Sequence, residues 1–146
     1  MATVSVRYIV NDVDTAIAFY RDHLGFTEVM HPAPTFAMLV RGDLRLVLSA
    51  PAGPGGPDGG GGQGGAGGPG GGGQAMPDGT VPTPGGWNRF ALEVADLSAT
   101  VRSLRENGVR FRNEIVEGVG GRQILAEDPS GNLVELFEPT RPEARL

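Results

Sequence analysis

The chain of 146 residues has no cysteine and only two histidines. Without cysteine it has no disulfide, no thiolate metal ligand and no cysteine nucleophile. No apolar stretch approaches the roughly 20 residues that a membrane-spanning helix needs, and the first ten residues do not resemble a secretory signal. We therefore expect a cytoplasmic protein that does not associate with membranes.

Basic residues are scarce as well. Lys and Arg number 12 against 17 Asp and Glu, which gives a net charge of −5. Proteins that bind nucleic acid through phosphates need clustered Lys and Arg, so we expect no nucleic-acid partner. An acidic chain instead favours a cationic ligand through its overall field.

Glycine is abundant, with 25 residues, and it is concentrated in one region. Residues 51–86 are mostly Gly and Pro, and such a segment buries too little apolar surface to offset its backbone entropy. This composition predicts a first module at 1–50, a Gly/Pro-rich mobile loop at 51–86 and a second module at 87–146. An expanded linker is our interpretation of the loop. A lid formed by residues 76–86 is the alternative.

The two modules show the same order of elements. In the first, a strand at Thr3–Val10 precedes a helix from Val13 to Leu24, whose apolar residues recur at helical spacing. Three strands follow: Phe26–Met30, Phe36–Arg41 and Leu44–Ser49. In the second, a strand at Phe90–Val94 and a helix at Leu97–Asn107 precede strands at Val109–Val116, Arg122–Ala126 and Leu133–Glu138.

The modules can be aligned with each other. Val10–Val13 matches Val94–Leu97, and Asp43–Leu48 matches Asn132–Phe137. Internal repetition of this kind is a signal about the fold. It predicts an α+β protein of two βαβββ modules related by a pseudo-twofold axis, which form a concave mixed sheet with flanking helices and a shared ligand cavity.

Three segments carry a resemblance to a known family. They are Val10–Asp12 with Ala18–Phe26, then Phe90–Leu97, and finally Asp128–Leu136. With these segments the chain resembles the vicinal oxygen chelate superfamily, which includes glyoxalases, extradiol dioxygenases and bleomycin-resistance proteins. The resemblance spans almost the whole chain outside the Gly-rich loop. It implies the fold, whereas its functions are diverse because one scaffold hosts unrelated chemistries.

The resemblance also implies where a metal would bind. Enzymes of this superfamily hold a divalent ion with His, Glu or Gln from four strands, and the matching positions here are Ser5, Leu46, Arg89 and Glu135. A divalent ion needs several oxygen or imidazole ligands, whereas Leu46 has no lone pair and Arg89 is a cation. We therefore expect no metal and no cofactor, with Glu135 as the one retained ligand type.

Glu135 needs a partner because a carboxylate within a sheet is costly unless it is paired. The arrangement predicts an ion pair between Arg89 and Glu135 where a metal would sit. Three interpretations stay open. The pair balances charge in a vestigial site, it forms a charged floor for a polar ligand, or Glu135 is a catalytic acid or base.

Other residues extend the candidate surface. Strand alternation places Arg7 and Glu93 on the faces of Ser5 and Arg89, where a mutual salt bridge is the alternative to ligand contact. Trp87 could stack on a planar ligand or anchor its strand. Met38 could contact the ligand or pack in the core. The ligand-binding candidates are Arg7, Met38, Trp87, Arg89, Glu93 and Glu135.

The two histidines fall outside the implied metal positions. His23 ends the first helix, where a cation complements the helix dipole. His31 precedes Pro32, and we expect it to be exposed. Neither residue changes the expectation of a metal-free site.

The sequence thus predicts a metal-independent protein that binds a small molecule, and the resemblance to the bleomycin-resistance branch implies that it sequesters an antibiotic or metabolite. The resemblance implies a homodimer. A glyoxalase-like lyase or isomerase, or an enzyme related to dioxygenases, is the first alternative. A scaffold with a vestigial cavity is the second.

Overall fold

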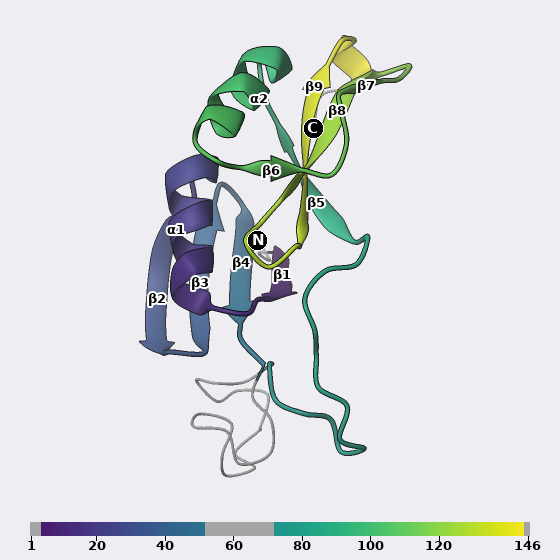
Figure 1. Cartoon of the computed structure of the whole chain (residues 1–146). Coiled ribbons are helices and arrows are strands. Elements are labelled where there is room, and N and C mark those ends of the chain that lie inside the picture. The colour runs from purple at the N-terminus through teal and green to yellow at the C-terminus, as the bar shows by residue number, and fades with distance from the viewer. Residues whose placement is uncertain (1–3, 52–71, 145–146) are drawn as a thin grey trace. The chain divides into compact units, whose positions relative to one another are not determined.

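The computed structural model describes residues 4–51 and 72–144. The chain divides into two compact units, Met1–Gly85 and Gly86–Leu146, each with one long helix and one sheet (Figure 1). Most of the predicted mobile loop, residues 52–71, lies outside the described residues, so the linker interpretation stays a prediction. The lid interpretation of residues 76–86 is untested and also stays a prediction.

The first unit contains one βαβββ module. Its elements are β1 (Val4–Ile9), α1 (Val13–Leu24), β2 (Thr27–Ala33), β3 (Phe36–Arg41) and β4 (Leu44–Ser49). The strands form a sheet in the order β1-β4-β3-β2, with β1 parallel to β4 and the other pairs antiparallel. Helix α1 contacts β2, β3 and β4 on one face of this sheet.

Helix α1 follows from its sequence. The Asp12 carboxylate caps it by accepting hydrogen bonds from the Thr15 hydroxyl and from Thr15 N, the latter at 2.8 Å, and these two bonds lower the pKa of Asp12. Gly25 ends it in the left-handed region with a φ of 73°, which favours glycine. The predicted apolar stripe is confirmed: all four of its residues are buried, namely Val13, Ile17, Tyr20 and Leu24.

The second unit repeats this order of elements, except that two short strands follow its long helix where the first unit has one strand. It contains β5 (Arg89–Glu93), α2 (Leu97–Glu106), β6 (Arg110–Phe111), β7 (Val116–Glu117), β8 (Gly121–Glu127), β9 (Leu133–Pro139) and the short helix η2 (Pro142–Ala144). Its five-stranded sheet has the order β5-β9-β8-β6, and β7 also pairs with β8. Strand β5 runs parallel to β9.

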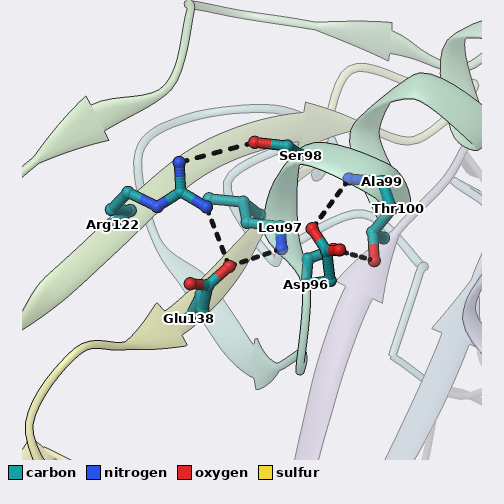
Figure 2. A network of polar contacts seen from close by, with 7 residues as sticks. All are labelled: Asp96, Leu97, Ser98, Ala99, Thr100, Arg122 and Glu138. Carbon is teal, nitrogen blue, oxygen red and sulfur yellow. Dashed lines mark hydrogen bonds and ion pairs between the residues drawn. The ribbon is translucent and has the colours of Figure 1, made fainter.

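Two carboxylates hold the start of α2, as Figure 2 shows. Asp96 accepts from Ala99 N at 3.0 Å, which is ordinary N-terminal capping. Glu138, from β9, accepts from Leu97 N at 2.6 Å and from Nη2 of Arg122 at 2.9 Å. These two donors lower the pKa of Glu138. A distant strand thus fixes where α2 begins.

The predicted α+β class and its two modules are confirmed. The predicted single strand Val109–Val116 is wrong, because the structure divides it into β6 and β7. The side chain of Asn113 accepts a hydrogen bond from Leu125 N at 2.9 Å, so a side chain replaces the backbone partner at this point of the ladder. The exposure expected for His31 is also wrong, since its side chain is 24% exposed and its Nε2 lies 3.6 Å from Asp14.

No helix in the described part of the chain is long and apolar enough to cross a membrane.

Candidate functional site

The candidate site lies on the sheet of the second unit, on the face away from α2. Residues that are neighbours across paired strands point to the same face. Glu135 pairs with Ala91 of β5 and with Leu125 of β8, whereas the neighbouring Leu136 is buried towards α2. Arg89 is two residues before Ala91, so it shares the face of Glu135.

The predicted ion pair between Arg89 and Glu135 is confirmed. Nε of Arg89 lies 3.1 Å from Oε1 of Glu135. Gln123 of β8 completes the group when its amide is oriented with the nitrogen towards Glu135, because this nitrogen then donates to both carboxylate oxygens, at 2.9 and 3.0 Å. Both oxygens of Glu135 are therefore engaged in hydrogen bonds. Sequence reasoning missed Gln123, although it lies on the same face as Glu135.

Trp87 lies just before β5 and is 68% exposed, which does not suit a buried anchor of the strand. The Arg112 guanidinium stands over its indole ring, 5.3 Å from the ring centroid, as in a cation–π contact. Nε of Arg112 is 2.7 Å from Oε1 of Glu127, and its Nη2 donates weakly to Gly131 O. Nη1 of Arg89 makes a long contact of 3.4 Å with Trp87 O.

These residues form one continuous group, which we call the Trp87 cluster: Trp87, Arg89, Arg112, Gln123, Glu127 and Glu135. The sequence identified three of the six. Arg112, Gln123 and Glu127 were missed because their relation to Trp87 and Glu135 depends on the pairing of β6, β8 and β9. Alternation on β8, applied from Glu135 through its partner Leu125, was the signal that could have found Gln123 and Glu127.

A buried turn holds one side of the Trp87 cluster. Asp128 is fully buried, and its Oδ1 accepts from Ser130 N and Asn132 N, each at 2.8 Å. Its Oδ2 accepts from Nδ2 of Asn132 at 3.0 Å. This turn fixes Glu127 on one side and the Gly131 carbonyl on the other, and Arg112 contacts both.

The first unit places two further candidates on the face away from α1. Nη1 of Arg7 donates to Oγ of Ser49 at 3.0 Å. Met38 is half-buried and pairs with Val47. Arg7 and Glu93 belong to different units, so a salt bridge between them stays a prediction.

The assignment of Leu46 as the repeat partner of Glu135 is wrong. Leu46 pairs with Val6 and Leu39, and it is fully buried on the α1 side of the sheet. The equivalent of Glu135 is Val47, which pairs with Arg7 just as Glu135 pairs with Ala91. Leu44–Leu48 is apolar at most positions, so its alternation could not set the register.

The corrected set, Ser5, Val47, Arg89 and Glu135, does not fit a divalent metal. Val47 offers no ligand atom, and Arg89 adds a positive charge beside the one carboxylate. Glu135 is already bonded through both oxygens. Over residues 4–51 and 72–144, no group of three or more His, Asp or Glu side chains is arranged to hold a metal.

A separate surface pocket of about 240 Å³ lies at the ends of β5 and β9, lined by Glu93, Val94, Ala95, Glu138 and Pro139. The Oε1 atom of Glu138 in it is bonded to Leu97 N and Arg122. This hollow therefore lies beside the structural contact that begins α2.

The family follows from comparison with known proteins. The model of the Glyoxalase/Bleomycin resistance protein/Dioxygenase superfamily matches residues 3–136. The chain belongs to this superfamily. No curated protein matches it.

Solved structures of the superfamily share the fold. A member from Sphaerobacter thermophilus is 25% identical, with a TM-score of 0.67 over 94% of this chain and 97% of that one. TnmS3, an antibiotic binding protein from Streptomyces sp. CB03234, is 22% identical, with a TM-score of 0.64 over 96% of this chain and 97% of its own. A lactoylglutathione lyase from Agrobacterium tumefaciens is 20% identical, with a TM-score of 0.63 over 94% and 92%.

Proposed function

We propose that this protein binds a small organic molecule at the Trp87 cluster without a metal and without catalysing a reaction on it. The observation that carries the proposal is the bonding of Glu135 through both of its oxygens to Arg89 and Gln123, beside an exposed Trp87. A carboxylate in this state serves as a fixed acceptor that orients Arg89. Its bonds to Arg89 and Gln123 would compete with a metal ion or a substrate proton for the same oxygens.

The shape and chemistry of the cluster support binding. A large exposed aromatic ring among polar groups is typical of ligand recognition, because the ring contributes contact area at low entropic cost. The likeness to an antibiotic binding protein supports the same interpretation. The proposed ligand is an antibiotic or metabolite. We propose Arg7, Met38 and Glu93 as further ligand contacts. The proposed modules are residues 1–50 and 87–146. A homodimer in the cytoplasm is the proposed setting.

Trp87 provides a direct assay because it is the one tryptophan of the chain. A panel of planar heteroaromatic compounds is titrated into the full-length protein while tryptophan fluorescence and the melting temperature are followed. We expect at least one compound to give saturable quenching and to raise the melting temperature, since binding to the native state stabilises it. In Trp87→Ala the rise in melting temperature is expected to disappear.

Arg105→Gln is the matched control, because Arg105 makes the same kinds of contact elsewhere in the unit. It lies over the Phe111 ring at 5.2 Å and pairs with Glu114 at 3.0 Å. The control should keep the ligand response. The proposal fails if no compound gives a response that depends on Trp87. It also fails if the purified protein carries one tightly bound metal per chain, which would favour the enzyme alternative.

A further inference from the structure

The two ion pairs of the Trp87 cluster are oriented alike. In each, the carboxylate is the more buried partner: Glu135 is 19% exposed against 31% for Arg89, and Glu127 is 18% exposed against 33% for Arg112. The formal charges of the four groups cancel, but the guanidinium groups are closer to solvent. A ligand that approaches from solvent therefore comes closer to the two guanidinium groups than to the two carboxylates. Its electrostatic interaction with the cations is stronger for this reason.

The guanidinium groups also keep hydrogen-bond donors free for a ligand. Arg89 uses Nε for Glu135 and Nη1 for Trp87 O, and Arg112 uses Nε for Glu127 and Nη2 for Gly131 O. Within residues 4–51 and 72–144, no acceptor is bonded to Nη2 of Arg89 or to Nη1 of Arg112. Arg112 thus offers a donor beside the indole ring and Arg89 offers one beside the Trp87 backbone, in the planar geometry that suits a carboxylate or a similar oxyanion.

The ring itself already has a cation on one face. Arg112 lies over the indole of Trp87, so it takes up the attraction that the ring offers to positive charge. A second cation near this ring would be repelled by Arg112. A planar anion gains from the same charges and stacks on the ring.

We propose that the Trp87 cluster selects planar aromatic ligands that carry an anionic oxygen, and that Arg112 sets this preference. The inference rests on the proposed binding function and names the ligand class. It opposes the expectation from the whole chain, whose net charge of −5 favours cations. The local order of charge, with guanidinium groups outside and carboxylates inside, outweighs the overall charge because screening limits distant charges to about 10 Å at 0.1 M salt.

Quenching of Trp87 fluorescence tests the preference whether or not a natural ligand is in hand. Four quenchers are compared at constant ionic strength: iodide, caesium, 4-nitrobenzoate and 4-nitrobenzylammonium. Each quenching constant is divided by that of free N-acetyltryptophanamide. We expect the normalised constants of the two anions to exceed those of the two cations by about threefold, given the partly solvated guanidinium of Arg112 over the ring.

Two variants separate the local effect from the overall charge. Arg112→Gln should reduce the preference for anions to less than about half, because it removes the nearer charge. Arg105→Gln changes the net charge by the same amount at a residue that contacts Phe111 and Glu114 instead of Trp87, and it should leave the preference unchanged. Urea denaturation of both variants establishes that they remain folded.

The outcomes distinguish the two proposals. Equal or stronger quenching by the cations overturns the ligand class, and so does an equal effect of the two variants. If iodide is favoured but 4-nitrobenzoate is not, the charge order is right and the aromatic anion is wrong, which also overturns the proposal. Failure of the binding function is a separate result, namely the absence of any compound that stabilises the protein through Trp87.

Discussion

Replacing Glu138 should destabilise the second unit more than its exposure suggests. The side chain is 20% exposed and accepts two hydrogen bonds, one from Leu97 N and one from Arg122 (Figure 2). Glu138→Ala leaves the first backbone N–H group of α2 without this acceptor, next to a fully buried Leu97. Loss of a charge-assisted bond at a helix start costs about 1–2 kcal/mol, and loss of the Arg122 pair adds up to about 1 kcal/mol. We expect Glu138→Ala to lower the free energy of unfolding by about 2 kcal/mol in total.

Glu138→Gln separates charge from hydrogen bonding. An amide oxygen still accepts from Leu97 N, so we expect a loss of about 1 kcal/mol. The matched control is Glu114→Ala, which removes the pair with Arg105 at 3.0 Å from a side chain that is 86% exposed. An exposed pair of this kind contributes about 0–1 kcal/mol. Urea denaturation followed by far-UV circular dichroism measures all three variants.

The pH dependence gives a second readout for the same residue. Leu97 N–H and Arg122 lower the pKa of Glu138 below its usual 4.5 in the folded state. A lowered carboxyl pKa stabilises the protein above the unfolded value, and this contribution is lost as the pH falls through the folded value. The difference in the free energy of unfolding between the natural protein and Glu138→Gln should therefore be constant above pH 4.5. It should decrease to zero in more acidic solution. Equal losses for Glu138→Ala and Glu114→Ala, or a gap that widens in acid, would refute this account.

Two further substitutions test how turns hold the modules. Gly25→Ala should lower the free energy of unfolding by about 1 kcal/mol, because Gly25 has a φ of 73°. An added Cβ there meets only ordinary contacts, so the backbone conformation is the cause. The control Gly118→Ala has no such φ and should be nearly neutral in the same urea experiment. Asp128→Asn should cost about 2 kcal/mol, because the new amide nitrogen is buried and faces donors. It should also change Trp87 fluorescence through Arg112, and an unaltered urea midpoint would contradict the role given to this turn.

Local sequence signals determined the elements that depend on neighbouring residues. Helix α1 was predicted with its observed bounds, because Asp12 and Gly25 provide the start and stop signals and four apolar residues mark its buried side. The bounds of β3 and β4 were also predicted. Between β6 and β7 the prediction failed, because the side chain of Asn113 interrupts the ladder by bonding Leu125 N across the sheet. No local pattern of residues 109–116 encodes that contact.

The candidate site was predictable to the extent that it follows from strand alternation. Glu135 and Arg89 were paired correctly, because the family resemblance assigns both residues to implied metal positions on neighbouring strands. Arg112 and Gln123 needed the observed strand pairing, because Arg112 follows β6 and Gln123 lies in β8, and the sequence does not connect these segments to Trp87 or Glu135. The register of β4 was mistaken by one residue, and a slip of one residue moves a side chain to the opposite face.

The corrected register shows why the two modules differ in chemistry while sharing a fold. The pairs Arg7–Val47 and Ala91–Glu135 are equivalent, and so are the pairs Phe36–Ser49 and Gln123–Phe137. The positions of Arg89, Gln123 and Glu135 in the second module are accordingly occupied by Ser5, Phe36 and Val47 in the first. The sheet register of both modules is set by the positions they share, which are apolar on the helix side. The polar group is confined to positions where the modules differ, so the proposed binding function depends on the asymmetry between the modules rather than on the repeat.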